Sequence, residues 1–210
     1  LMAELENGVK VLGESMIAKC KKQQDCRIEH MSLVPPDVRA LDESIYAIES
    51  ADVIVYGPGS LYTSIVPNLL VDGICGAVQN SNALKIYVCN VMTQDGETEG
   101  YTVSDHIKGL FSHANCRLFD ICLANDAPIS PEMQAKYALE GAEPAVVDAE
   151  EVKGLGIELI TCPLASEAGG VVRHNSDKIA SEIIRLHYER HDRGDLSRFD
   201  RAMVKYIDKL

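Results

Sequence analysis

The sequence predicts an α/β fold in which strands and helices alternate along one large domain. Short apolar runs alternate with segments in which apolar residues recur at helical spacing, a pattern typical of layered α/β folds. The chain has 210 residues, of which 46% are hydrophobic, so it is long enough to bury a sizeable core. Both observations favour a globular domain with an internal sheet.

Seven apolar runs predict strands. Most are rich in β-branched residues and end in turn-forming or polar residues, as strands of an α/β sheet do. They cover residues 9–13, 27–34, 52–57, 84–90, 118–125, 144–148 and 157–163.

Helices are predicted between these strands. In the segments 42–50 and 68–81, apolar residues line one face at helical spacing. Residues 130–141 form a third predicted helix, with Ser130 as N-cap, Pro131 in the first turn and Gly141 as its end. A helix is also expected around His106 and His113.

The C-terminal part divides into two segments. A helix opening at Asn175 or Ser176 is expected to bury Ile179, Ile183 and Leu186. Residues 191–210 change composition and predict a charged amphipathic tail helix. The sequence therefore predicts a domain over residues 1–190 followed by a tail that docks on it or forms an oligomer.

Composition narrows the class of protein. The net charge of −12 argues against a nucleic-acid-binding surface, and no apolar run approaches the ~20 residues of a membrane span. Seven cysteines without a C-x-x-C pair predict reduced thiols and a cytoplasmic protein. The chain begins without methionine or a signal peptide, and we expect it to be the C-terminal part of a longer protein.

The turn after residues 52–56 is the first candidate site. It reads Gly57-Pro58-Gly59-Ser60, and the hydroxyls of Thr63 and Ser64 follow in the next turn. Gly59 permits a positive φ and a close approach to the backbone, while free N–H groups at a helix start attract anions. Two interpretations fit: a cradle for a phosphate, or a tight turn with Ser60 as a plain N-cap. The turn matches neither the P-loop nor the dinucleotide-binding fingerprint.

Polar residues at the next strand end extend this candidate site. Asn90, Thr93 and Gln94 are expected to form neutral hydrogen bonds with a sugar or base. The acidic run that follows could supply oxygen ligands for Mg²⁺, but a solvated loop is the favoured interpretation; it contains Asp95, Glu97, Glu99 and Asp105. His106 and His113 are seven residues apart, which predicts surface or capping residues and no metal pair. No catalytic constellation is visible.

Three blocks of the sequence carry a family resemblance. They read GPGSLYTSIVPNLLVDGI, KIYVCNVMTQDGETEGYTVSDHIKGL and GGVVRHNSDKIA. Together they resemble the YvcK branch of the YvcK/CofD-like family, the gluconeogenesis factors. The glycine-rich and acidic blocks that open family members have no counterpart in this sequence, and we expect them to precede residue 1 in the intact protein.

The resemblance implies a Rossmann-like three-layer α/β/α sandwich with a mainly parallel sheet. The YvcK branch is associated with binding UDP-N-acetylglucosamine and with cell-wall synthesis and cell shape during growth on gluconeogenic carbon sources. The CofD branch instead transfers 2-phospho-L-lactate from a guanosine diphosphate conjugate to a deazaflavin, with Mg²⁺, on the coenzyme F420 pathway. A regulator without a cofactor is the favoured interpretation, with a homo-oligomer and partners in cell-wall synthesis left open.

The resemblance also adds residues to the site. The blocks around Tyr137 and Arg173 align with the region that closes the YvcK-branch nucleotide-sugar site. The guanidinium of Arg173 suits a diphosphate, and the ring of Tyr137 suits stacking on a uracil. A surface salt bridge and core packing are their structural alternatives. Ser176, at a helix start, is a weaker candidate for regulatory phosphorylation, with simple capping as its alternative.

Overall fold

A parallel sheet of four strands forms the centre of the molecule. The computed structural model describes residues 1–114 and 117–190. The strands are β4 (Val53–Tyr56), β5 (Leu84–Val88), β6 (Ile121–Asn125) and β7 (Glu158–Cys162), and they lie side by side in that order. Their parallel register and the helices between them confirm the predicted Rossmann-like α/β fold.

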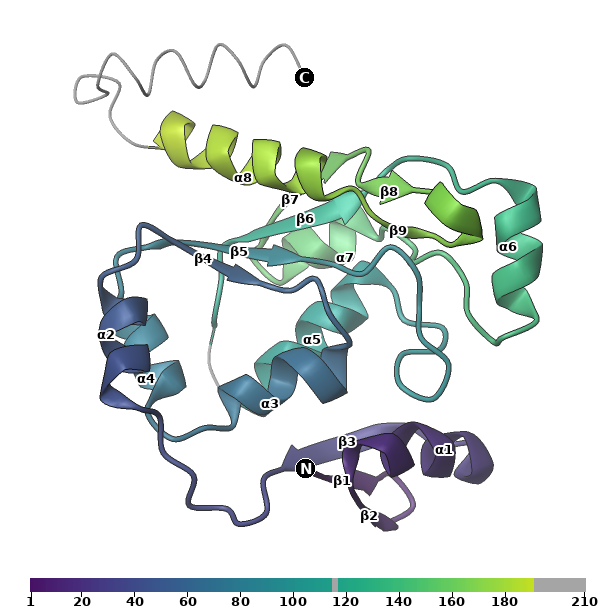
Figure 1. Ribbon diagram of the computed structural model, residues 1–210, viewed down its shortest axis with the longest axis horizontal. Coiled ribbons are helices and arrows are strands. Elements are labelled where there is room, and N and C mark those ends of the chain that lie inside the picture. The colour runs from purple at the N-terminus through teal and green to yellow at the C-terminus, as the bar shows by residue number, and fades with distance from the viewer. Residues whose placement is uncertain (115–116, 191–210) are drawn as a thin grey trace.

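Helices cover both faces of this sheet (Figure 1). One face carries α8 (Ser176–Arg190), and the other carries α3 (Val66–Leu69), α5 (Val103–Ala114) and α7 (Ala149–Gly154). Successive side chains of a strand point to opposite faces, so β5 contributes side chains to two hydrophobic cores. Ile86 packs in the cluster under α8 with Leu186, whereas Tyr87 packs in the cluster beside α5 with Phe119. This separation produces the three layers.

The predicted helix over residues 68–81 is two helices. α3 ends at Leu69, and α4 (Ile74–Asn80) begins after Gly73, whose φ of +95° breaks the helical path. A π-helical turn (Leu61–Ile65) leads into α3. The helix predicted at residues 42–50 is confirmed as α2 (Asp42–Glu49), which packs against α4.

A small antiparallel sheet lies beside α3 and α5, away from the central sheet (Figure 1). It contains β1 (Met2–Leu5), β2 (Lys10–Leu12) and β3 (Ile28–Ser32), in the order β2-β1-β3, with α1 (Glu14–Gln24) between its strands in sequence. Neither β1 nor α1 was predicted. α1 buries only Ile17 and Lys21, which is too little to form an apolar stripe in the sequence.

A third unit completes the carboxyl edge of the central sheet. It comprises α6 (Pro131–Ala138), the short strands β8 (Ala165–Ser166) and β9 (Arg173–His174), and a 3₁₀ turn (Ala168–Gly170). Ser130 caps α6 as predicted, because its hydroxyl accepts from the Met133 amide. The strand predicted at 144–148 is wrong: this extended segment forms only isolated bridges, Met92 with Pro144 and Thr102 with Val146.

The predictions for the tail helix, the cysteines and membrane spans can be compared with the structure only within the described residues. The tail helix over 191–210 and Cys116 lie outside them. The six other cysteines form no disulfide in the described part of the chain, as predicted. Across residues 1–114 and 117–190, no helix combines the length and apolar character needed to cross a membrane.

Candidate functional site

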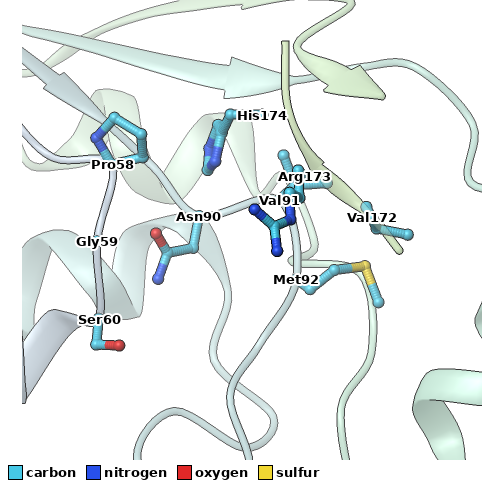
Figure 2. Close-up of a pocket in the computed structure, with 9 residues that line it drawn as sticks. All are labelled: Pro58, Gly59, Ser60, Asn90, Val91, Met92, Val172, Arg173 and His174. Carbon is cyan, nitrogen blue, oxygen red and sulfur yellow. The ribbon is translucent and has the colours of Figure 1, made fainter. Parts of the chain in front are cut away.

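A cavity of about 360 Å³ lies at the carboxyl ends of β4 and β5. Three segments distant in sequence form its wall: the turn after β4, the loop after β5, and β9 with the residue before it (Figure 2). The lining residues are Pro58, Gly59, Ser60, Asn90, Val91, Met92, Val172, Arg173 and His174. The cavity thus occupies the edge where ligands bind in open α/β sheets.

Four sequence-predicted residues meet in this cavity: Gly59, Ser60, Asn90 and Arg173. In Figure 2 the guanidinium of Arg173 extends toward the side of Asn90. Within residues 1–114 and 117–190, no side chain forms an ion pair with Arg173, and none of the lining residues carries a carboxylate. The cavity therefore presents an uncompensated positive charge on a chain whose net charge is −12.

His174 also lines the cavity, although the sequence analysis gave it no role. Its Nε2 lies 3.0 Å from the carbonyl oxygen of Cys89 and donates to it in the neutral tautomer. Burial lowers the pKa of this imidazole, so it is neutral at physiological pH and Nδ1 is left as an acceptor. The only sequence signal was its position directly after Arg173.

The structure gives Gly57 the positive φ that the sequence predicted for Gly59. Gly57, not Gly59, has the positive φ, +80°, and a Cβ there would lie 3.1 Å from the carbonyl oxygen of Val88. A Cβ at Gly59 would lie 3.3 Å from the Cβ of Ser64. Gly57 and Ser64 line a separate apolar cavity of about 380 Å³ toward α2 and α4, beside Ile65. Of the two glycines, only Gly59 lines the cavity that contains Arg173.

Glu97 occupies the helix start that follows Ser60. Its carboxylate accepts the backbone N–H of Tyr62 at 3.2 Å and the hydroxyl of Thr63 at 2.6 Å. Both groups are donors that we predicted for a bound anion. The side chain of Ser60 does not cap the helix but donates to Oε1 of Gln94 at 2.7 Å. A carboxylate of the chain itself thus supplies the negative charge at this helix terminus.

The expectation of a solvated acidic loop is wrong for Glu97. Its exposed fraction is only 1%, and burial raises its pKa even though its hydrogen bonds act in the opposite direction. No local pattern in the sequence marked it, because Tyr62 and Thr63, whose donors it accepts, lie more than thirty positions away along the chain.

Thr93 and Gln94 stand behind the cavity wall. Thr93 is buried, and its hydroxyl accepts from the amide of Glu143 at 2.9 Å. The side chain of Gln94 joins Ser60 to Glu97, with its Nε2 3.3 Å from Oε1 of Glu97. Neither residue lines the cavity, and only Gln94 contacts a lining residue, Ser60.

Tyr137 lies next to the cavity without lining it. Its hydroxyl donates to the carbonyl oxygen of Val172 at 3.3 Å and accepts the N–H of Val172 at 3.0 Å. Its ring packs in an apolar cluster with Val91 and Met133. Tyr137 therefore holds the backbone that carries Arg173, and stacking of its ring on a base stays a prediction.

The acidic loop does not fit a Mg²⁺ site. Asp95 pairs with Lys22 at 2.5 Å, Glu99 pairs with Lys21, and Glu97 is satisfied by Tyr62 and Thr63 as described above. In the part of the chain that the structure describes, no group of three or more histidine, cysteine, aspartate or glutamate residues could hold a metal ion.

The two histidines of α5 are not surface residues. His106 is fully buried, with Nδ1 2.8 Å from the carbonyl oxygen of Thr102. His113 is partly buried, and its Nε2 accepts the N–H of Met31 at 3.0 Å. Their prediction as surface or capping residues was wrong because α5 lies between the central sheet and β3.

A parallel α/β sheet with helices on both faces and a cationic cavity at its carboxyl edge defines a Rossmann-like α/β domain. Residues 1–165 match the family model described as 2-phospho-L-lactate transferase CofD, and the chain belongs to this family. The predicted resemblance is thereby confirmed.

Relatives and solved structures agree with this assignment. The chain is 47% identical over 184 residues to the gluconeogenesis factor of Halalkalibacterium halodurans, covering 88% of this chain and 56% of that protein. It is 44% identical over 186 residues to the gluconeogenesis factor of Bacillus subtilis, covering 89% and 57%. A crystal structure of a UPF0052 family member from Bacillus halodurans matches with a TM-score of 0.83 and 47% identity, over 87% of this chain and 58% of that one. The chain thus spans a little over half the length of these relatives.

Proposed function

We propose that this chain forms part of a cytoplasmic regulatory protein that binds UDP-N-acetylglucosamine and affects cell-wall synthesis and cell shape on gluconeogenic carbon sources. The observation that carries the proposal is Arg173, which has no ion-pair partner among the described residues and lies in a cavity whose lining residues carry no carboxylate. The gluconeogenesis factors among the relatives support the regulatory role.

The chemistry of the cavity supports a nucleoside diphosphate sugar. A guanidinium offers paired donors to a diphosphate and keeps its charge at every physiological pH. Asn90 and Ser60 offer polar groups to one side of it, whereas Met92 and Val172 form an apolar wall on the other (Figure 2). The cavity of about 360 Å³ falls within the usual range for small-molecule sites, ~300–1,000 Å³.

Titration calorimetry of Arg173→Ala in the full-length protein tests this proposal. Loss of a charge-assisted contact to phosphate should weaken binding of UDP-N-acetylglucosamine by roughly tenfold to a hundredfold. Arg39→Ala is the matched control, because Arg39 is exposed and pairs only loosely with Asp72, at 3.6 Å. Melting without ligand should be unchanged in both variants. Wild-type affinity in Arg173→Ala would refute the assignment.

A transferase that acts on a nucleotide diphosphate conjugate is the second candidate, because the matching family model bears that name. The acidic block expected ahead of residue 1 discriminates between the two candidates: metal-binding carboxylates there, together with deazaflavin synthesis in the same cell, would favour the transferase. Incubating the full-length protein with Mg²⁺, a deazaflavin acceptor and the guanosine diphosphate conjugate of 2-phospho-L-lactate separates the two. Formation of the phospholactyl deazaflavin would establish the transferase.

A further inference from the structure

We propose that Ser60 accepts a hydrogen bond from a sugar hydroxyl of the ligand, because Glu97, acting through Gln94, directs the proton of Ser60 away from the cavity. The inference rests on the proposed function and deepens it: Ser60 becomes a specificity-determining residue and Glu97 a positioning residue. Three linked hydrogen-bond steps carry it.

Glu97 is the fixed end of a hydrogen-bond chain that runs from Glu97 through Gln94 to Ser60, called the relay below. Three donors converge on its carboxylate: the N–H of Tyr62, the hydroxyl of Thr63 and Nε2 of Gln94. An ionised carboxylate has acceptors only, so it satisfies all three at once. The backbone N–H of Tyr62 cannot reverse its direction, which fixes the polarity at this end.

Gln94 transmits that polarity. A glutamine amide has a donor end and an acceptor end, and its orientation follows from its hydrogen-bond partners. With Nε2 directed at Glu97, Oε1 must face Ser60, which lies 2.7 Å away. The reverse orientation would place the amide oxygen against the carboxylate, which is repulsive. Since Oε1 cannot donate, Ser60 must.

Ser60 is thereby left with acceptor capacity alone. A serine hydroxyl has one proton and two lone pairs, and the proton is committed to Gln94. Ser60 lines the cavity, so only its lone pairs are available to a ligand there. A phosphate oxygen has no proton to offer, whereas a sugar hydroxyl does.

The arrangement of the cavity places the sugar at this end. Figure 2 shows Ser60 and Asn90 on one side, the guanidinium of Arg173 between, and Met92 and Val172 on the other side. With the diphosphate at Arg173, the apolar wall suits the flat base, and the Ser60 side suits the hydroxyl-rich sugar. Asn90 can both donate and accept there, so it complements Ser60.

Glu97→Gln is the decisive substitution because it reverses the relay without changing its shape. The amide oxygen must still accept the N–H of Tyr62, so the new amide nitrogen faces Gln94. Gln94 then turns its oxygen to residue 97 and its nitrogen to Ser60. The hydroxyl of Ser60 accepts from Gln94, and its proton points into the cavity.

Affinity measurements with fluorinated ligands detect whether the hydroxyl of Ser60 accepts or donates a hydrogen bond in the cavity. UDP-N-acetylglucosamine is compared with analogues in which one sugar hydroxyl at a time is replaced by fluorine, which cannot donate. In the wild type, one analogue should bind about two- to tenfold more weakly than the parent. That loss should disappear in Ser60→Ala and shrink in Glu97→Gln. The exposed Glu143→Gln serves as matched control and should keep the wild-type ratio.

The outcomes separate this inference from the proposed function. If the parent ligand does not bind the wild type, the proposed function itself fails. If the parent binds but no analogue is weaker, or the loss persists in Ser60→Ala, the role of Ser60 is refuted. If Glu97→Gln keeps the wild-type ratio, the role of Glu97 is refuted. Gln94→Met, which removes the acceptor for the Ser60 proton, gives the same test should Glu97→Gln not fold.

Discussion

Arg173 and His174 are neighbours in β9 that contribute differently to the cavity. The guanidinium is charged at every physiological pH, whereas burial lowers the pKa of His174 and keeps its imidazole neutral. A bound diphosphate would favour the charged imidazolium, since opposite charges raise the pKa of a histidine. Ligand binding and protonation of His174 should therefore be linked.

We expect the affinity for UDP-N-acetylglucosamine to rise as the pH falls below about 6.5, the ordinary pKa of histidine. The bound state takes up a proton on His174, and the diphosphate of the ligand stays ionised throughout. Calorimetry at several pH values in buffers of different ionisation enthalpy would measure both the affinity and the proton uptake. In His174→Gln the pH dependence should flatten, and an unchanged profile in that variant would contradict this linkage.

At the residue scale, the sequence predicted residues that line the cavity better than the residues that hold them in place through hydrogen bonds. Gly59, Ser60 and Asn90 were predicted because strand ends converge at one edge of a parallel sheet, whereas Arg173 was predicted from the family resemblance. Glu97 was missed because its role depends on tertiary contacts, with Tyr62 and Thr63 of the preceding helix start. Such pairings leave no local pattern.

At the element scale, β9 is positioned by α6. Both strands of the β8–β9 pair have only two residues, so their own ladder gives little stability. The hydroxyl of Tyr137, on α6, exchanges two hydrogen bonds with the backbone of Val172, directly before Arg173. The same shortness explains why β8 and β9 were not predicted, whereas the longer strands β4 to β7 were.

Tyr137→Phe distinguishes positioning from stacking on a base. The ring is kept, so a stacking role would leave affinity unchanged. Loss of the two hydrogen bonds to Val172 should instead weaken UDP-N-acetylglucosamine binding by about two- to tenfold. Calorimetry measures the change, with Tyr46→Phe as control because Tyr46 is exposed on α2. Wild-type affinity in Tyr137→Phe would exclude the positioning role.

At the scale of the whole molecule, hydrophobic periodicity predicted the layers but not the small sheet. The two inner strands of the central sheet, β5 and β6, are buried on both faces and read as continuous apolar runs. The small sheet packs beside α5, where the N–H of Met31 binds the partly buried His113. His106 on the same helix is fully buried, whereas the sequence predicted both as surface or capping residues. Burial of polar residues by a second layer is a tertiary property that helical spacing does not encode.

Burial of these histidines makes the stability of the fold depend on pH. Burial lowers the pKa values of His106, His113 and His174 below their ordinary value. The unfolded chain therefore binds more protons than the folded chain once the pH falls below about 6.5. His106 is the most sensitive: within the described residues its buried Nε2 has no hydrogen-bond partner, so a proton there would lack an acceptor. Protonation of His113 would break its bond with the N–H of Met31.

We therefore expect the free energy of unfolding to fall between pH 6.5 and 5, by at most about 1.4 kcal/mol per pH unit for each histidine. Glu97 acts in the opposite direction, because its raised pKa makes the folded state take up a proton first. Asp105 and Asp148, whose pKa values are lowered, matter only below about 4. Urea unfolding at several pH values measures the slope. His106→Phe keeps a ring against Tyr101 but cannot titrate, so its slope should be shallower. A slope equal to that of the wild type would show that His106 is not the group that the acid protonates.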